Sequence, residues 1–326
     1  MMRRRLPSIR HPANPGRMRI LRDYQYALPE DRGAAVAIGN FDGVHLGHQH
    51  VIDQARHRDM PLGLLTFEPH PRQFFAPDSP PFRLMNAEAR ANRLQKLGVD
   101  ILYELPFNAA LAGLTAEAFA REVLAEGLGV KRVIVGADFC FGKGRAGTVG
   151  MLTAFGQEMG FDVNVVPIKH GDLGAISSTN IRLALSEGRP RDAASMLGHW
   201  HRIEGPVVHG EKRGRTLGYP TANMGLEGLH LPKLGVYAVI VDVRDGAHPG
   251  TYHGVASLGV RPMFGGEVPN LETFLFDFSG DLYGCDLSVA LIDYLRPEMK
   301  FDGLDALIRQ MDADSDTARA ILKALP

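Results

Sequence analysis

Two histidines, His45 and His48, lie three residues apart in the sequence GNFDGVHLGH, which spans residues 39–48. Residues at this spacing project from the same side of a helical turn. Two imidazoles beside a phosphate can donate hydrogen bonds in either charge state, and they offset developing negative charge when they are protonated. Because this stretch contains no obvious nucleophile, we expect catalysis by positioning and electrostatic stabilisation of a phosphate group.

The residues around the two histidines predict a strand, a glycine-rich turn and a helix, in that order. The apolar run 34–38 is typical of a parallel strand that is covered on both faces. Apolar residues recur at helical spacing from Leu46 onward. The helix therefore begins near residues 45–47, where unpaired backbone N–H groups and the helix dipole favour an anion. Three glycines in the turn, Gly39, Gly43 and Gly47, allow positive φ angles or a close approach of the backbone to a phosphate.

The histidine pair has two other interpretations, namely surface imidazoles without a role and part of a zinc site. Zinc is disfavoured, because the His-Glu-x-x-His pattern is absent and the two cysteines, Cys140 and Cys285, are far apart without ligand-like spacing. The combination of strand, glycine turn, paired histidines and helix start favours the phosphate site over both alternatives.

The string GNFDGVHLGH resembles the signature of the HxGH nucleotidyltransferases. In its full length it is similar to the FMN adenylyltransferase module of prokaryotic bifunctional riboflavin kinase/FAD synthetases. The resemblance implies catalytic roles for His45 and His48. It also implies that the ATP-binding residues of this segment are Gly39, Asn40, Phe41, Asp42, Gly43 and Gly47.

Alternating apolar runs and helical patterns predict an α/β fold, a doubly wound Rossmann-like domain whose further parallel strands lie at residues 62–67, 101–104, 133–135 and 163–166. Ligands of such sheets bind beyond the carboxyl ends of the strands. The segments that follow the strands are therefore the places to search for chemistry.

Two of these segments carry groups that suit a flavin. Pro-His-Pro after the second strand is a stiff loop on spacing alone, and the resemblance implies that His70 and Pro71 bind the flavin. Aromatic and cationic residues after the strand at 133–135 suit a flat ring with phosphates nearby. There the resemblance implies flavin binding by Asp138 and Phe139, with Cys140 in place of a frequent arginine.

A run of hydroxyl residues, Ser-Ser-Thr-Asn-Ile-Arg at residues 177–182, leads into a helical pattern. Hydroxyls before a helix are ordinary N-caps, but a hydroxyl run with an arginine is also a second anion cradle. The run is similar to the Ser-Ser-Thr-x-x-Arg element of the family. This similarity implies ATP binding by Ser178, Thr179 and Arg182.

From residue 201 the apolar pattern changes to period two. It predicts a small antiparallel barrel with strands at residues 236–243, 252–258, 272–278 and 287–293, followed by terminal helices. A glycine-rich basic loop at 210–218 attracts phosphate by composition, although a solvated hairpin tip is the alternative. Thr221 and Asn223 lie two apart on an extended segment, so their oxygens share one face and suit Mg²⁺ with triphosphate oxygens.

Pro-Thr-Ala-Asn at residues 220–223 is similar to the riboflavin kinase signature, and Gly-Val-Tyr-Ala, Ser-Leu-Gly-Val-Arg-Pro and Gly-Asp-Leu-Tyr-Gly follow it as in that family. The resemblance implies that Glu272 receives the proton of the substrate hydroxyl, that Thr221 and Asn223 hold the metal and that Arg261 lies near the flavin. Without the resemblance, Glu272 is an ordinary strand carboxylate. The residues assigned to ATP in this half are Gly210, Lys212, Gly214, Thr216, Gly218 and Asn223. Met263, Thr273 and Phe274 depart from the common pattern of the family.

Length and composition indicate a two-domain globular chain. The 326 residues are 45% hydrophobic and 22% charged, and the formal net charge is −1. We expect a disordered leader at 1–17, with Met18 as a possible true start, an adenylyltransferase domain at 18–186, a linker at 187–199 and a kinase domain at 200–326. The charge gives no argument for nucleic acid or membrane binding, and the two cysteines fit a reducing, cytoplasmic location.

The combined expectation is a bifunctional enzyme that converts riboflavin and ATP to FMN, and FMN and ATP to FAD and pyrophosphate, with Mg²⁺. We expect small-molecule substrates as its only partners and a monomer or weak homo-oligomer. One alternative is an enzyme of the same superfamily that acts on another acceptor, such as nicotinate mononucleotide or phosphopantetheine. The other is a flavin-binding protein with degenerate sites.

Overall fold

The computed structural model describes residues 18–167, 170–171, 174–210, 219–263 and 266–325. For residues 170–171, 174–175, 261–263 and 266–267 only the backbone is described. Contacts between residues in space divide the chain into two compact units. Unit 1 comprises Met1–Gly39, Gln54–Pro71 and Arg93–Val166, and unit 2 comprises Asn40–Asp53, Arg72–Asn92 and Pro167–Pro326. The expected leader at 1–17 lies outside the described residues.

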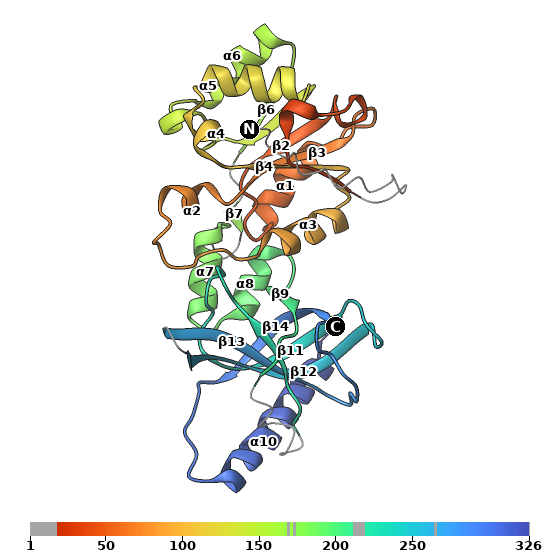
Figure 1. Ribbon diagram of the computed structural model, residues 1–326, viewed down its shortest axis with the longest axis vertical. Coiled ribbons are helices and arrows are strands. Elements are labelled where there is room, and N and C mark those ends of the chain that lie inside the picture. The colour runs from red at the N-terminus through yellow and green to blue at the C-terminus, as the bar shows by residue number, and fades with distance from the viewer. Residues whose placement is uncertain (1–17, 168–169, 172–173, 211–218, 264–265, 326) are drawn as a thin grey trace, which may run out of the picture. The chain divides into compact units, whose positions relative to one another are not determined.

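Unit 1 contains a six-stranded sheet in which every strand runs parallel to its neighbours (Figure 1). The strands are β1 (Arg19–Leu21), β2 (Ala35–Ile38), β3 (Leu62–Glu68), β4 (Ile101–Pro106), β5 (Arg132–Gly136) and β6 (Asp162–Val166). Their order is β1-β4-β3-β2-β5-β6. The chain adds β3 and β4 on one side of β2, and β5 and β6 on the other. This order places the topological switch point, where ligands of such sheets bind, between β2 and β5.

The inner strands of the unit 1 sheet, β2 to β5, are buried on both faces, whereas the edge strands β1 and β6 are more exposed. On one face, Val36, Tyr103 and Val133 pack against Phe119 and Leu152 in a single apolar cluster. Strand residues of alternate position, such as Ala37 and Leu64, are fully buried as well. This double burial explains the continuous apolar runs in the sequence. The helical elements are η1 (Tyr24–Tyr26), η2 (Pro29–Asp31), α4 (Ala109–Gly113), α5 (Ala116–Ala118), η3 (Phe119–Gly127), η4 (Lys143–Arg145) and α6 (Val149–Met159).

Five helices in unit 2, or crossing into it, surround the segments predicted to bind phosphate. They are α1 (Leu46–Gln54), α2 (Pro71–Phe75), α3 (Ala87–Lys96), α7 (Ser178–Ser186) and α8 (Pro190–Leu197), and a short hairpin of β7 (His170–Gly171) and β8 (Gly174–Ala175) precedes α7. Leu84, Ile181 and Leu197 form an apolar cluster with Leu46 packed against it. The cluster holds the start of α1 beside α7 and α8.

The second sheet of unit 2 is an antiparallel, nearly closed barrel. Its strands are β9 (Arg202–Pro206), β10 (Ala222–Gly225), β11 (Gly235–Val243), β12 (Gly250–Met263), β13 (Gly266–Leu275) and β14 (Asp286–Arg296). The strand order is β10-β13-β12-β11-β14-β9. An isolated backbone bridge between Val208 and Asn223 links the segment after β9 to β10, so the ring is nearly closed.

Two predicted barrel strands have markedly different bounds in the structure. The strand expected at 252–258 is β12, which runs from Gly250 to Met263. The strand expected at 272–278 is β13, which begins at Gly266 and ends at Leu275. Asp277 follows with a positive φ of 56°, a conformation that ends an extended strand and turns the chain.

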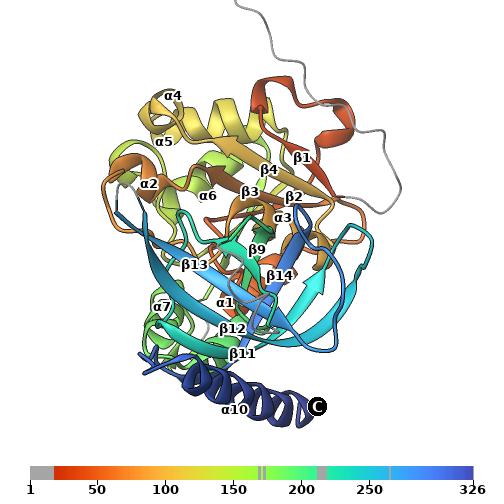
Figure 2. The same ribbon diagram turned by 60° about the horizontal axis from the view of Figure 1, so that its bottom comes forward.

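A single long helix, α10 (Leu304–Lys323), covers part of the barrel where terminal helices were expected (Figure 2). Ala318 and Leu322 of α10 are buried against Ala238, Phe276 and Ile292 of the barrel. The apolar spacing that predicted helix therefore marks the face that packs on the strands.

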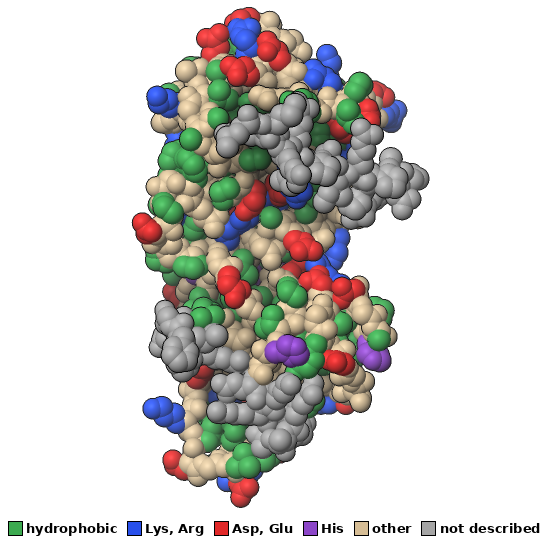
Figure 3. Space-filling view, in the orientation of Figure 1, with side chains coloured by type: hydrophobic (Ala, Val, Ile, Leu, Met, Phe, Trp, Pro, Cys, Tyr) green, Lys and Arg blue, Asp and Glu red, His purple; other side chains and the backbone are tan. Residues whose placement is uncertain are grey.

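The described helices include none that is both long and apolar enough to cross a bilayer. On the face shown in Figure 3, acidic and basic side chains of the described residues are interspersed.

Candidate active sites

The loop that leads from β2 into α1 has an unusual backbone. Phe41, Gly43 and Val44 have positive φ angles of 51°, 85° and 44°, and the Val44 N–H donates to the Phe41 carbonyl at 3.2 Å. A Cβ on Gly43 would lie 2.7 Å from a methyl carbon of Leu84. Gly43 is therefore required by both conformation and space, and a β-branched residue at positive φ marks local strain of a kind found at binding sites.

His45 is the N-cap of α1. Its Nδ1 accepts a hydrogen bond from the backbone N–H of His48 at 3.2 Å, and its carbonyl accepts from Gln49 N–H at 2.9 Å. Because Nδ1 is the acceptor, the neutral ring carries its proton on Nε2. A Cβ on Gly47 would lie 3.1 Å from the His45 ring, so the glycine leaves room for the imidazole.

The two imidazoles are stacked, with ring centroids 3.6 Å apart and an angle of 14° between the rings. The His48 ring also packs edge to face against the Phe41 ring, with the two centroids 5.2 Å apart. Burial lowers the pKa of His45 to about 4 and, with a smaller contribution from the neighbouring His45, lowers the pKa of His48 well below its usual value. Both rings are therefore neutral at pH 7, and their chemistry is hydrogen-bond donation. Nδ1 of His48 is buried and has no hydrogen-bond partner in the described part of the chain.

Asp42 joins the two segments that were predicted to bind phosphate. Its carboxylate accepts from the Leu84 N–H at 2.8 Å and from Arg182 Nη2 at 2.6 Å. Its carbonyl accepts from the Ser178 hydroxyl at 2.8 Å. The structure therefore brings the glycine loop and the start of α7 together, as the sequence suggested, through a carboxylate that is itself buried.

The N-terminus of α7 has the predicted cap. The Ser177 hydroxyl accepts from the Asn180 N–H at 3.2 Å, and Thr179 is exposed in the first turn. Arg182 follows one turn later, half-buried, and its Nε donates to the Phe82 carbonyl at 2.6 Å. Hydroxyl, exposed N–H groups and guanidinium lie within one turn of each other, which suits an anion.

The residues predicted to bind flavin in the first half follow strands of unit 1. His70 is buried two residues after the end of β3, and α2 begins at Pro71, so the expected extended loop is shorter than predicted. Proline is favoured at the first position of a helix because it lacks the N–H that would be unpaired there. Asp138 is exposed and Phe139 half-buried just after β5, beside the switch point, and Gly39 directly follows β2.

The barrel brings the metal and base candidates of the second half together. Asn223 on β10 pairs directly with Glu272 on β13, so the two side chains share one face. Asn223 is buried, donates to the Thr221 carbonyl at 3.2 Å and accepts from Asn270 Nδ2 at 3.3 Å. A Cβ on Gly210 would lie 2.5 Å from Asn223 Nδ2, so only glycine leaves this amide in place.

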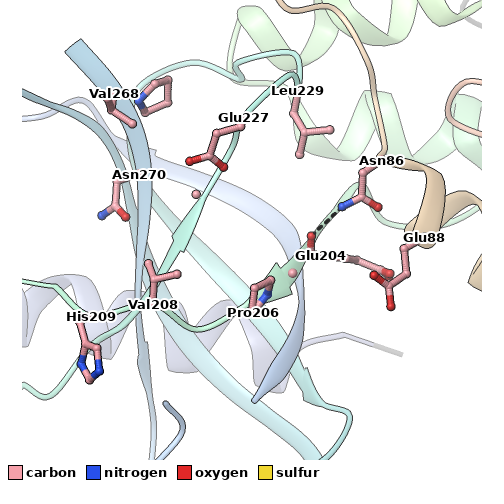
Figure 4. A pocket seen from close by; sticks show the side chains of 13 residues that line it. Asn86, Glu88, Glu204, Pro206, Val208, His209, Glu227, Leu229, Val268 and Asn270 are labelled. Carbon is pink, nitrogen blue, oxygen red and sulfur yellow. Dashed lines mark hydrogen bonds between the residues drawn. The ribbon is translucent and has the colours of Figure 1, made fainter. Parts of the chain in front are cut away.

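A pocket of about 380 Å³ lies next to these residues (Figure 4). Asn86, Glu88 and Glu204 lie at one end of it, and His209 and Asn270 lie toward the other. Asn270 links the pocket to the amide of Asn223. Because several carboxylates line the pocket, it suits an uncharged ring better than a phosphate.

Several predicted residues lie wholly or partly outside the described part of the chain. Lys212, Gly214, Thr216 and Gly218 lie outside the described residues. Arg261 is described by its backbone alone, which pairs with Val268 near the end of β12.

Comparison with known proteins covers both halves of the chain. A family model described as FAD synthetase matches residues 27–180, and one described as riboflavin kinase matches residues 197–322. The bifunctional riboflavin kinase/FMN adenylyltransferase of Pseudomonas fluorescens is 41% identical over 309 residues, which cover 93% of this chain and 98% of the relative. The protein of the same name from Haemophilus influenzae is 38% identical over 311 residues, covering 94% and 100%.

The chain belongs to the bifunctional riboflavin kinase/FMN adenylyltransferase family. It phosphorylates riboflavin with ATP to give FMN, and it adenylylates FMN with ATP to give FAD and pyrophosphate. This result confirms the expected activity. It disfavours both alternatives, an enzyme that acts on another acceptor such as nicotinate mononucleotide and a flavin-binding protein with degenerate sites. A crystal structure titled macrolide-efflux protein, from Streptococcus pneumoniae, is similar to this chain with a TM-score of 0.79 and 33% identity, covering 92% of this chain and 98% of that one.

Sequence reasoning missed residues that support the predicted ones in this enzyme. Asn270 lies two positions before Glu272 on β13, so strand alternation from Glu272 was the available signal. The Tyr219 hydroxyl donates to the Asp312 carboxylate of α10, and its ring centroid lies 4.8 Å from that of Phe274. These two contacts anchor the segment just before β10. Phe82, whose carbonyl binds Arg182, carried no signal because it lies outside every motif.

Proposed function

We propose that FMN is made in the barrel domain, residues 200–326, with Glu272 as the general base. The ribityl hydroxyl oxygen of riboflavin attacks the γ-phosphorus of ATP, its proton passes to Glu272, and ADP leaves with the electron pair of the broken P–O bond. The observation that carries this assignment is the direct pairing of Glu272 with Asn223. It puts a carboxylate beside the amide predicted to face the metal.

The metal site of this proposal consists of Thr221 and Asn223. The oxygens of a hydroxyl and a buried amide are hard ligands that suit Mg²⁺, whose remaining positions go to substrate phosphates and water. The fit is supported by Gly210, since any larger residue would displace the Asn223 amide. Bound Mg²⁺ would neutralise charge on the triphosphate, while Gly210, Lys212, Gly214, Thr216 and Gly218 would surround the phosphates.

We propose that adenylyl transfer, within residues 18–186, uses the stacked histidines as neutral donors. A phosphate oxygen of FMN attacks the α-phosphorus of ATP, and pyrophosphate leaves with the electron pair of the broken bond. The Nε2–H of His45 is a donor for a phosphate oxygen because Nδ1 already accepts from the backbone. His48, Ser178, Thr179 and Arg182 would bind the triphosphate with the backbone of Gly39, Asn40, Phe41, Gly43 and Gly47.

The remaining assignments complete the proposal. In unit 1, His70, Pro71, Asp138 and Phe139 would bind the flavin, a role supported by their positions at the carboxyl ends of β3 and β5. Arg261 would bind the flavin in the barrel. We give Asp42 a positioning role, since its carboxylate is engaged by Arg182 and Leu84. A cytoplasmic location is supported by two free cysteines, and small molecules are the proposed partners of a monomer or weak homo-oligomer.

Flavin chromatography tests the whole proposal. Purified protein is incubated with riboflavin and ATP, with and without Mg²⁺, and with FMN and ATP in a second set. FMN and FAD should form in the first set and FAD in the second, in both cases only with the metal. A His48→Ala variant should lose FAD synthesis and keep FMN synthesis. Full FAD synthesis by this variant would refute the adenylyltransferase assignment.

A further inference from the structure

Phe82, between α2 and α3, lies beside two arginine side chains. Its ring centroid is 4.5 Å from Cζ of Arg72 and 5.4 Å from Cζ of Arg182, and the residue is buried with 6% of its surface exposed. Both distances are within the range of cation–π attraction, about 6 Å. One aromatic ring thus lies within cation–π distance of two permanent positive charges.

Arg182 is fixed in this cluster by three different contacts. Besides the ring, its Nε donates to the Phe82 carbonyl at 2.6 Å and its Nη2 to Asp42 at 2.6 Å. A guanidinium has five N–H donors, so it can make these two bonds and still bind a phosphate. The guanidinium therefore has a defined orientation before any substrate arrives.

The segment that contains Phe82 also orders the glycine loop. Leu84, two positions after Phe82, donates its N–H to the other oxygen of Asp42 at 2.8 Å, and Ser178 binds the Asp42 carbonyl. The segment 82–84 therefore contacts Arg182 directly and contacts the loop that precedes His45 through Asp42. A change at Phe82 would reach both groups.

We propose that Phe82 is a positioning residue for adenylyl transfer, and that it holds Arg72 and Arg182 as a pair that binds the β- and γ-phosphates of ATP and the departing pyrophosphate. The inference rests on the proposed adenylyltransferase site. In the step concerned, the bond from an FMN phosphate oxygen to the α-phosphorus forms and the bond to the β-phosphate oxygen breaks. The electron pair and its charge go to pyrophosphate, which two oriented guanidinium groups stabilise.

In this proposal the aromatic ring is the group that attracts both cations. Like charges repel, and the negative face of a ring offsets part of that repulsion. An aliphatic residue of similar size would fill the space but would not attract either guanidinium. Tyrosine keeps the ring, so Phe82→Leu and Phe82→Tyr separate packing from cation positioning.

The experiment uses the full-length enzyme in both directions of adenylyl transfer. KM for ATP is measured in FAD synthesis, and KM for pyrophosphate in the reverse reaction of FAD with pyrophosphate. Phe82→Leu should raise both KM values about fivefold or more, Phe82→Tyr should stay within twofold of the unsubstituted enzyme, and riboflavin kinase activity should be unchanged in both. In an Arg72→Gln background, Phe82→Leu should have a smaller effect on KM for pyrophosphate than it has alone.

A matched control is Phe276→Leu. Phe276 is also buried and packs against a guanidinium, with Cζ of Arg319 at 4.2 Å, but it lies in the barrel. It should leave KM for pyrophosphate unchanged. Equal effects of Phe82→Leu and Phe82→Tyr, equal losses in both activities of Phe82→Leu, or full additivity with Arg72→Gln would each overturn the inference. If His48→Ala abolishes FAD synthesis while Phe82→Leu leaves both KM values unchanged, this inference alone fails and the proposed function stands.

Discussion

Asn223 on β10 and Glu272 on β13 lie directly opposite each other in the barrel, on one face of two paired strands. Ser257 on β12 pairs with Glu272 from the other side. Opposed residues of this kind have Cβ atoms about 5 Å apart. The carboxylate proposed as the base and the amide proposed to face the metal are thus held together by strand register, with no loop between them.

Glu272→Gln should abolish FMN formation while FAD synthesis from supplied FMN continues. The glutamine amide cannot accept the proton of the ribityl hydroxyl. Loss of a general base typically lowers the rate by a factor of about 10²–10⁴. The measurement is chromatography of flavins formed from riboflavin, and separately from FMN, with the same preparation. Loss of both activities would contradict two independent sites.

Gly210→Ala should lower kinase activity by about tenfold or more, which is the loss expected when a metal ligand is displaced. It should also raise the Mg²⁺ concentration needed for half the maximal rate. The reason is steric, because the new Cβ would lie 2.5 Å from Asn223 Nδ2. Gly113→Ala is the matched control, since nothing lies within 4 Å of its Cβ position in α4. A normal Mg²⁺ dependence for Gly210→Ala would remove Asn223 from the metal site.

The inner strands of the parallel sheet, β2 to β5, could be predicted because they are buried on both faces and read as apolar runs. β1 was missed, since three residues carry no period. The end of β13 was misplaced for a tertiary reason. Asp277, at positive φ, accepts hydrogen bonds from the two terminal nitrogens of the Arg319 guanidinium on α10, at 2.7 and 2.9 Å, and local sequence does not encode that contact.

The site could be predicted where chemistry-bearing residues follow a strand or begin a helix. His45, Ser178 and Arg182 fall in this class, and the structure brings the loop before His45 into contact with the other two through Asp42. The neutral state of the histidines was not predictable, because it follows from burial by residues distant in sequence. Phe82 was missed since the role proposed for it comes from the arginines around it.

His45→Asn should abolish most FAD synthesis without unfolding α1. Asparagine is a good N-cap, so its side-chain oxygen can accept the N–H of His48, but it cannot reproduce the Nε2–H donor. Loss of one donor to a developing negative charge costs roughly 10²–10³ in kcat. His45→Ala should show the same loss and, in addition, about 1 kcal/mol less stability, because the cap is gone.

Steady-state rates of FAD synthesis and urea unfolding, run in parallel, check this pair of variants. Kinase activity in the same protein serves as an internal control. His253→Asn, at an exposed position of β12, is the matched substitution and should leave both activities intact. If His45→Asn retained its rate, His45 would be a structural cap and nothing more.

His201→Gln should make the stability of the enzyme less sensitive to acid. His201 is 4% exposed, and burial, with smaller contributions from His199 and His230, lowers its pKa to about 3. In the unfolded chain an ordinary histidine has a pKa near 6.5. As the pH falls below about 6.5, the unfolded chain binds a proton that the folded chain does not bind. Each such histidine therefore removes about 1.4 kcal/mol of stability per pH unit, until the folded pKa is reached.

Urea unfolding at intervals between pH 6 and pH 4 measures this slope. The unsubstituted enzyme should lose stability with contributions from His201 and from His45, whose pKa is lowered to about 4, and His201→Gln should remove one proton from the slope. The absolute stability at pH 7 does not enter, because the comparison is between slopes. Identical slopes for the two proteins would contradict the prediction. They would mean that His201 binds its proton equally well in the folded and the unfolded chain, although burial beside two other imidazoles disfavours the charged ring.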